Sequence, residues 1–457
     1  MAFHNVEKFS VGYFLMKVYS ALGNYMFYRR IISHNRQNVP PEGAIIMAPN
    51  HQNALMDALA VANNHKEAIV FLARSDIFKK KSTARILYLM KILPIYRIRD
   101  GASEVMKNKK VFDKTVQILK SNMRLTILPE GNHAGFRRLR PLQKGISRIA
   151  FQAEEAADFK LGIKIIPVGI DYSHYYKFRS DLFINYGPAI EVSDFYDTYK
   201  ENPQKGMNDL KLKVAEQLSK VMLDIRTEKY YETCYALREI YRDRIGDHLN
   251  LNSCKQPGKF ICDKSLNVML DEYIDRKPEE FEAVDELVKE YTKGVEKLNL
   301  RDWVFKKKSH SILNIGLRIL LLLPLLPIYI FGVINNYLPY KIPELVTKKV
   351  KDEQFISSFR YVVGLITFPI FYLIFSIVFF MLIPDPIWRT AYVLSLPLTG
   401  LFAFSYYKWS KKIWALLRFS FGISKSEKEQ IFELRNDIRE KLDEISVEIK
   451  PVEPDFS

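Results

Sequence analysis

The chain has 457 residues, of which 68 are basic and 52 acidic, giving a net charge of +16. This balance favours acidic partners, namely anionic lipid surfaces, phosphorylated substrates or nucleic acid, and does not choose among them. The three cysteines, Cys234, Cys254 and Cys262, form no CxxC pair, which excludes a disulfide-stapled fold and a zinc site of the usual spacing. HExxH, Walker and GxGxxG motifs are also missing from the sequence, so we expect no metal and no cofactor.

The first 34 residues contain an aromatic stretch, Phe9 to Ile31, that ends near the basic pair Arg29 and Arg30. Such a helix is predicted to lie on a membrane with its apolar face down. An amphipathic helix packed on the adjoining domain is the alternative. We expect no cleavable signal peptide, because lysines interrupt the apolar residues and no small-residue cleavage site follows.

Between Val39 and Gly187, strand-like apolar runs alternate with helical patterns. This alternation predicts an α/β domain with a largely parallel sheet. We place this domain at residues 35–225, followed by a helical accessory region at 226–305. A membrane region at 306–418 and a charged helical tail at 419–457 complete the predicted organisation.

The stretch from Ile45 to Asp57 is the candidate catalytic centre. A strand that ends at Pro49 would put His51 on the loop leaving the sheet, where α/β folds place their chemistry. Asn53 is a plausible cap for a helix that carries Asp57 in its first turn. A histidine there can take a proton from a hydroxyl while the carboxylate orients the imidazole. By spacing alone, a structural role for His51 is favoured over a catalytic one.

Three further clusters lie at predicted strand ends. In an extended chain Arg97 and Arg99 would point to the same side, which suits a phosphate clamp or a charged sheet edge. Glu130 and Gly131 follow a strand and precede a run of basic residues, which suits either a phosphate site or a solvated turn. Pro167 falls inside an apolar strand and predicts that this strand is an edge strand or begins there.

Three long apolar runs follow, at residues 312–333, 361–383 and 387–407, and they predict an integral membrane protein. Basic residues precede the first run, separate it from the second and follow the third. These three segments are therefore expected on the cytoplasmic side, together with the catalytic domain. Runs two and three then form a hairpin that turns at Pro384-Asp385-Pro386. The first run must return to its own side, and Pro324 and Pro327 near its middle predict a re-entrant or in-plane segment.

Four of these clusters, in this order, resemble the sequence boxes of glycerolipid acyltransferases of the PlsC type. They are the NHxxxxD-like box at Asn50 to Asp57, an arginine box at Pro94 to Arg99, a PEG box at Pro129 to Gly131 and an IPV box at Ile166 to Val168. The resemblance covers about residues 35–225 and implies the PlsC-like fold of that family. It also implies that His51 is the general base that activates a glycerol hydroxyl against a fatty acyl thioester, with Asp57 as its orienter. The implied substrate-binding residues are Asn50, Arg97, Arg99, Glu130, Gly131, His133, Arg137 and Arg138.

Two departures from the common pattern are informative. Five residues instead of four separate His51 from Asp57, and PEGTRS is replaced by PEGNHAG, which removes an expected arginine. Both departures, and the segment LRPLQKG at Leu139 to Gly145, resemble the branch of fungal glycerol-3-phosphate and dihydroxyacetone-phosphate acyltransferases. The resemblance therefore implies glycerol-3-phosphate as the acceptor in phosphatidic acid synthesis, with acyl-CoA or acyl-carrier protein as co-substrate.

Two other functions stay open on the sequence. The acceptor can instead be lysophosphatidic acid, the monoacylated product of the same pathway. A non-enzymatic protein that binds membrane phospholipids and has kept the fold is the alternative from another class. Nucleic-acid binding fits the charge but not the apolar runs, so we expect no nucleic-acid partner.

Overall fold

The computed structural model describes residues 6–96, 108–132 and 134–456. These residues form two compact units. The first unit comprises residues 1–224, 351–358 and 454–457, and the second comprises residues 225–350 and 359–453. The first unit therefore holds the predicted catalytic domain together with two short segments from later in the chain.

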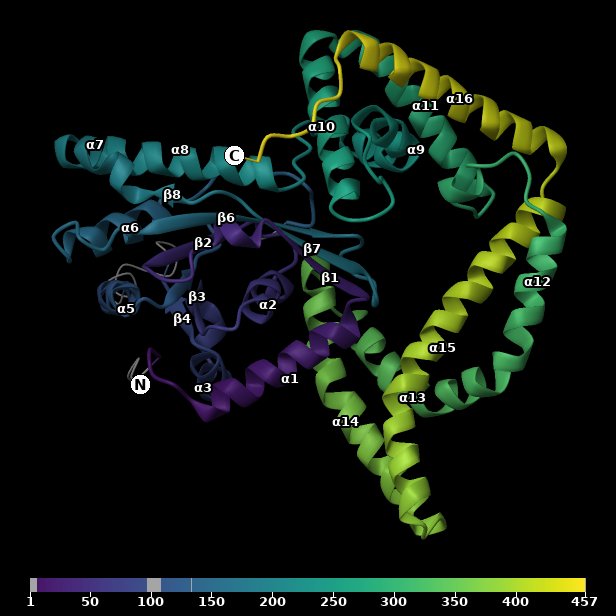
Figure 1. Ribbon diagram of the computed structural model, residues 1–457, viewed down its shortest axis with the longest axis horizontal. Coiled ribbons are helices and arrows are strands. Elements are labelled where there is room, and N and C mark those ends of the chain that lie inside the picture. Colours follow the sequence, from purple (N-terminus) through teal and green to yellow (C-terminus); the bar gives the residue numbers. More distant parts are fainter. Residues whose placement is uncertain (1–5, 97–107, 133, 457) are drawn as a thin grey trace. The chain divides into compact units, whose positions relative to one another are not determined.

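The first unit is built on an eight-stranded sheet, which Figure 1 shows edge-on. The strand order is β1-β7-β6-β2-β5-β3-β4, and β8 pairs with β6. All neighbours are parallel except the pairs that β6 makes with β7 and β8. The strands are β1 (Arg30–His34), β2 (Ile45–Pro49), β3 (Ile69–Arg74), β4 (Ile92–Ile95), β5 (Arg124–Thr126), β6 (Lys164–Tyr172), β7 (Asp181–Tyr186) and β8 (Ile190–Glu191). The predicted α/β class with a mostly parallel sheet is confirmed.

Helices cover this sheet and bury its central strands. All five residues of β2 are buried, as expected for a strand with a parallel neighbour on each side and helices over its faces. One core joins β2, β3, β5 and β6 to α5, α6 and α8. The helices of this unit are α1 (Val11–Phe27), α2 (Leu55–Asn64), α3 (Lys81–Leu89), α5 (Asn108–Lys120), α6 (Gly145–Glu155), α7 (Tyr196–Glu201) and α8 (Pro203–Val221).

Pro167 is not on an edge strand, and that prediction is wrong. It lies in β6, between β2 on one side and β7 and β8 on the other. The residues paired with β8 end at Ile165, and those paired with β7 begin at Val168. Pro167 occupies the gap between these two ladders, where a missing N–H removes no strand-to-strand hydrogen bond.

Helix α1 both packs on the domain and exposes an apolar face. Its small and polar residues face α2, where the Asn24 side chain reaches the carbonyl oxygen of Leu59. The opposite face carries exposed apolar side chains, among them Leu15 and Tyr25. Packing on the domain is thus established, and the apolar face is what a membrane-associating helix requires. The contact with lipid stays a prediction.

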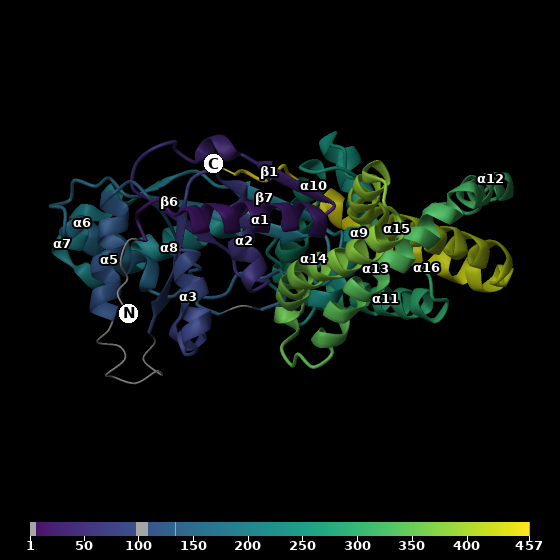
Figure 2. The same ribbon diagram turned by 90° about the horizontal axis from the view of Figure 1, so that it is seen from below.

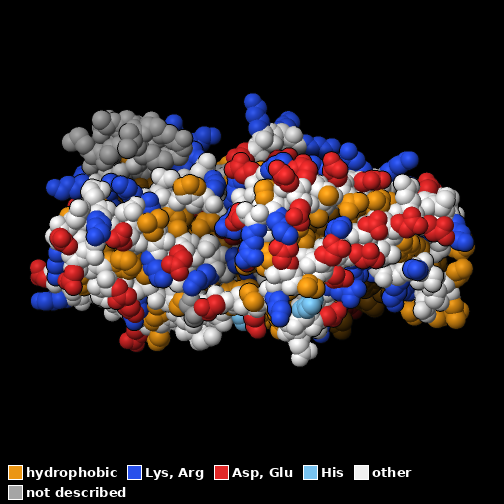
Figure 3. Space-filling model, turned by 90° about the horizontal axis from the view of Figure 1, so that it is seen from above, with side chains coloured by type: hydrophobic (Ala, Val, Ile, Leu, Met, Phe, Trp, Pro, Cys, Tyr) orange, Lys and Arg blue, Asp and Glu red, His pale blue; other side chains and the backbone are white. Residues whose placement is uncertain are grey.

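The second unit is helical. Helices α9 (Tyr231–Leu249), α10 (Gly258–Arg276), α11 (Pro278–Lys297) and α16 (Lys425–Glu448) enclose a core of their own. Figure 3 shows acidic and basic side chains interspersed over the outer surface of α10 and α16. Ser424 and Glu427 form a capping box at the start of α16, which fixes where the predicted tail helix begins.

The described chain contains three helical stretches long and apolar enough to cross a membrane: Ile312–Thr347, Glu353–Leu382 and Pro386–Phe421. They comprise α12 (Ile312–Leu322), α13 (Leu326–Thr347), α14 (Ile356–Leu382) and α15 (Pro386–Phe421). The first stretch bends between α12 and α13, at the prolines named above, and α13 lies along α15 (Figure 2). The turn between α14 and α15 falls at the predicted Pro384-Asp385-Pro386. The re-entrant path of the first stretch stays a prediction.

Candidate active site

The loop after β2 holds the predicted catalytic residues at the carboxyl end of a central strand. His51 is two residues beyond the end of β2, which is flanked by β5 and β6. Asn50 is buried and fixes the start of this loop on β6. Its side-chain oxygen accepts the N–H of Ile170 at 2.6 Å, and its Nδ2 donates to the Ile170 carbonyl at 3.1 Å. In this position Asn50 shapes the loop. The contact of Asn50 with substrate stays a prediction.

His51 and Asp57 form a hydrogen-bonded dyad. Nδ1 of His51 lies 2.9 Å from Oδ2 of Asp57. The same carboxylate oxygen accepts the backbone N–H groups of Gln52 and Asn53, at 2.8 and 2.7 Å. Since an ionised carboxylate only accepts hydrogen bonds, the imidazole hydrogen is assigned to Nδ1. This tautomer makes Nε2 the nitrogen that can take a proton.

Tyr172 completes the environment of Asp57. Its hydroxyl donates to Oδ1 of Asp57 at 2.8 Å from the end of β6. Burial, reinforced by the charge of Asp57, raises the pKa of Tyr172 well above its usual value. The phenol therefore stays protonated and acts as a permanent donor, which holds the carboxylate in one orientation.

The extra residue between His51 and Asp57 is absorbed by a tight turn. Ala54 has a φ of 46°, and the next residue, Leu55, begins α2. The dyad distance shows that five intervening residues still bring the two side chains together. Asn53 does not cap α2, so that prediction is wrong: its Nδ2 donates to the Tyr175 carbonyl at 3.3 Å, and Ala54 takes the cap position.

Glu130 is buried directly beneath the catalytic loop. Its Oε1 accepts the backbone N–H of His51 at 2.8 Å, and its Oε2 accepts Nε of Arg140 at 2.8 Å. Burial raises the pKa of Glu130 above its usual value, against the opposing effects of these two donors. Gly131 has a φ of 69°, and a Cβ there would lie 2.9 Å from Cγ of Gln143. The PEG motif thus supports the position of His51.

The basic residues predicted to bind substrate fall into three groups. Arg137 is buried, with Nε 2.9 Å from Oδ1 of Asp171 and its guanidinium 4.9 Å from the centre of the Tyr175 ring. These contacts favour a role in holding the end of β6. Arg138 is half-buried. The remaining predicted residues, Arg97, Arg99 and His133, lie outside the described residues.

Sequence reasoning did not assign three residues that the structure brings to the site. Arg140 belongs to the run of basic residues after Gly131, and its side chain donates both to Glu130 and, at 3.4 Å, to the His51 carbonyl. Tyr172 follows the IPV box by a few residues. Its contact with Asp57 depends on the pairing of β6 with β2, which the sequence alone does not reveal. Gln52 accepts a hydrogen bond from the Tyr175 hydroxyl at 2.6 Å.

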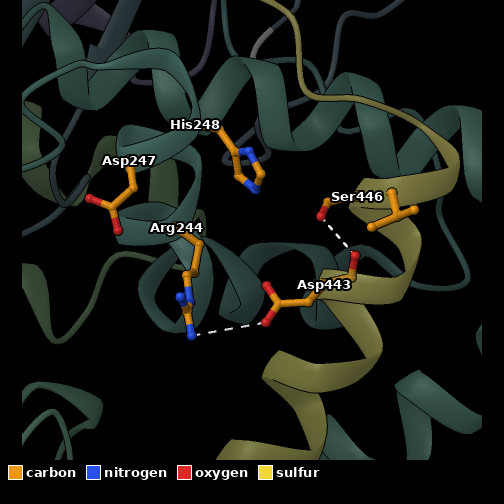
Figure 4. A pocket seen from close by; sticks show the side chains of 6 residues that line it. Arg244, Asp247, His248, Asp443 and Ser446 are labelled. Carbon is orange, nitrogen blue, oxygen red and sulfur yellow. Dashed lines mark hydrogen bonds and ion pairs between the residues drawn. The ribbon is translucent and has the colours of Figure 1, made fainter.

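Two hollows in the described part of the chain lie away from the dyad. One is at the amino ends of β2 and β5 and is lined by Lys17, Lys91 and Arg124, among others. The other lies between α9 and α16, where Arg244 Nη2 is 3.9 Å from Asp443 Oδ2 (Figure 4). Among the described residues, no group of three or more His, Cys, Asp or Glu side chains is placed to hold a metal ion.

Comparison with known proteins identifies the family of this domain. Residues 30–171 match the model of the family described as Acyltransferase, so this part of the chain is an acyltransferase-family domain and the predicted resemblance is confirmed there. The match contains the dyad, Glu130 and Arg140.

The chain is also similar to two curated proteins of Saccharomyces cerevisiae, Glycerol-3-phosphate O-acyltransferase 2 and Glycerol-3-phosphate O-acyltransferase 1. Each is 22% identical to it, over 300 and 302 residues, which are 61% and 62% of this chain. The aligned region spans 39% of the length of each relative. A solved structure, the 1-acyl-sn-glycerophosphate (LPA) acyltransferase PlsC of Thermotoga maritima, aligns over 45% of this chain and 79% of its own, with 15% identity and a TM-score of 0.32.

Proposed function

We propose, from the acyltransferase-family domain at residues 30–171, that this chain is a glycerolipid O-acyltransferase. It moves a fatty acyl group from an acyl thioester to a hydroxyl of glycerol-3-phosphate, a step toward phosphatidic acid. The observation that carries the proposal is the dyad of His51 and Asp57 inside the family match. The yeast relatives, both named for glycerol-3-phosphate, favour that acceptor.

In the proposed reaction His51 is the general base. As the acceptor oxygen attacks the thioester carbonyl carbon, its proton passes to Nε2, and Asp57 stabilises the imidazolium through Nδ1–H. When the tetrahedral intermediate collapses, the C–S bond breaks and His51 returns the proton to the departing thiolate. The products are an ester and a free thiol, and the enzyme is regenerated with no cofactor.

The phosphate of the acceptor requires positive charge near this loop. We assign it to the basic residues around the PEG motif, with Arg140 added to the predicted set. Arg140 is partly exposed, at 23% of its side chain, and Glu130 fixes its Nε. A guanidinium held in this way presents its remaining N–H groups in a fixed geometry, which suits a phosphate. Arg97, Arg99, His133 and Arg138 keep their predicted roles as substrate-binding residues.

The acceptor and donor can be identified by direct product analysis. Purified full-length protein would be supplied with glycerol-3-phosphate or lysophosphatidic acid, each with acyl-CoA or acyl-carrier protein, and the lipid products detected by mass spectrometry. We expect lysophosphatidic acid to form from glycerol-3-phosphate. Product from lysophosphatidic acid alone would establish the alternative acceptor, and no product from any combination would favour a protein that only binds lipids.

The apolar helices and the exposed face of α1 support an integral membrane enzyme in contact with phospholipids. We propose that the catalytic domain faces the cytoplasm, because basic residues flank the apolar stretches. In a Cys254→Ser background, which removes the exposed native thiol, Lys307→Cys and Lys349→Cys should react with an impermeant reagent from the same side. Labelling from opposite sides would contradict this topology.

A further inference from the structure

The segment that leads into α14 and forms its first turn belongs to the same compact unit as the active site. Residues 351–358 are grouped with residues 1–224, whereas the chain on either side of them belongs to the second unit. Two serines in this segment, Ser357 and Ser358, are buried, and both lie far outside the family match at residues 30–171. The catalytic unit thus includes residues that the family domain does not supply.

Ser358 caps the helix that carries the dyad aspartate. Its Oγ accepts the N–H of Leu55, the first residue of α2, at 3.2 Å. The first N–H groups of a helix have no partner within the helix. One of them is commonly accepted by a side-chain oxygen of the residue that comes just before the helix. That residue is Ala54, which has no side-chain acceptor. Ser358 therefore replaces a local cap from 303 positions along the chain.

Ser357 holds the opposite side of the same loop. Its hydroxyl donates to the carbonyl oxygen of Tyr175, which also accepts Nδ2 of Asn53 at 3.3 Å. The Tyr175 hydroxyl donates to Gln52 at 2.6 Å. Tyr175 is thus tied to two residues of the catalytic loop, and Ser357 fixes the backbone of Tyr175.

These contacts surround the one unfavourable backbone conformation in the loop. Ala54 has φ and ψ of 46° and −121°, a region that residues with a Cβ rarely adopt. Such a conformation persists only where neighbouring contacts enforce it. The turn at Ala54 lies within the five-residue stretch that joins His51 to Asp57. Contacts that enforce the turn therefore set the geometry of the dyad.

We propose that Ser357 and Ser358, in the first turn of α14, are positioning residues for the His51–Asp57 dyad. The structural part of this proposal concerns the loop alone. Its catalytic consequence rests on the proposed acyl transfer. Loss of the two hydroxyls removes the side-chain acceptor of the Leu55 N–H and one of two donors to the Tyr175 carbonyl. This loosens the turn and the dyad without changing any residue predicted to bind substrate.

The test uses the full-length protein in detergent micelles and compares Ser358→Ala, Ser357→Ala and the double variant with wild type. Amide hydrogen exchange, followed by mass spectrometry on peptides covering residues 52–58, reports on the loop whether or not the protein is active. We expect about tenfold faster exchange at Leu55 in Ser358→Ala, the effect of losing one hydrogen bond. In the double variant, kcat should fall about tenfold, while KM for both substrates stays within about twofold.

Ser410→Ala is the matched control, because Ser410 lies in the second unit and its hydroxyl donates to the Tyr407 carbonyl of its own helix. It should change neither exchange in the loop nor kcat. Unchanged exchange in both Ser358→Ala and the double variant would overturn the proposal, and so would faster exchange with unchanged kcat. If wild type itself makes no product, the proposed function fails, and the exchange data still decide whether the serines hold the loop.

Discussion

Replacing Asp57 with asparagine tests the role of the dyad charge with little change in shape. Three donors point at Oδ2 of Asp57 and one, the Tyr172 hydroxyl, at Oδ1. In Asp57→Asn, the amide oxygen can keep the three donors if the NH2 group faces Tyr172, whose hydroxyl can rotate to accept. The variant therefore folds with a similar loop and loses mainly the negative charge beside His51.

The expected rate loss follows from that charge. Two opposite charges about 4 Å apart interact by about 4 kcal/mol at an effective dielectric constant of about 20. Losing this stabilisation of the imidazolium slows the chemical step by about three orders of magnitude. The assay is kcat for product formation at saturating acceptor and acyl thioester.

Tyr172→Phe is the matched control for the same carboxylate. It removes the hydrogen bond to Oδ1 and leaves the charge of Asp57 in place. A single lost hydrogen bond of this kind corresponds to a rate loss of about tenfold. The reasoning is refuted if Asp57→Asn keeps kcat within tenfold of wild type, or if Tyr172→Phe is equally damaging.

Three other predictions concern the catalytic loop and the stability of the fold that carries it. Glu130→Gln puts an amide donor against either the loop N–H or Arg140, so kcat should fall about tenfold or more; wild-type kcat would contradict this. Gly169→Ala places a Cβ 1.9 Å from the carbonyl oxygen of the last residue of α8 and should destabilise the fold by more than about 3 kcal/mol. Gly145→Ala, which has open space around the added Cβ, should not destabilise the fold. Thermal unfolding of both variants is the measurement. Burial lowers the pKa of His65 to about 3, so the folded state resists the proton that the unfolded chain binds below about pH 6.5. Stability should therefore fall by about 2 kcal/mol from pH 7 to pH 5, and His65→Gln should remove this dependence.

The local parts of the site were predictable from the sequence. A few adjacent residues indicate each of these parts, through apolar runs, proline and glycine. The parts are the strand that ends before His51, the helix that carries Asp57 and the turn at the glycine after Glu130. The alternation of strands and helices likewise predicted the mostly parallel sheet. These features depend on neighbours along the chain, which a single sequence displays.

The long-range parts were not predictable in the same way. Tyr172 reaches Asp57 only because β6 pairs with β2, and Ser358 reaches Leu55 across 303 positions. The edge-strand prediction from Pro167 was wrong because Pro167 lies opposite the gap between β7 and β8, and that gap exists only in the assembled sheet. Arg137, one of a run of basic residues, is buried against Asp171, a partner that its sequence neighbourhood does not reveal.

The central claim is that His51 catalyses acyl transfer to glycerol-3-phosphate. The most direct test is the rate of lysophosphatidic acid formation by purified His51→Ala, beside wild type and His248→Ala, which removes an exposed histidine of α9. Thermal unfolding of all three proteins would confirm that each is folded. The account predicts a loss of at least about a hundredfold in His51→Ala and wild-type rates in His248→Ala. A folded His51→Ala protein that makes product at the wild-type rate would contradict it.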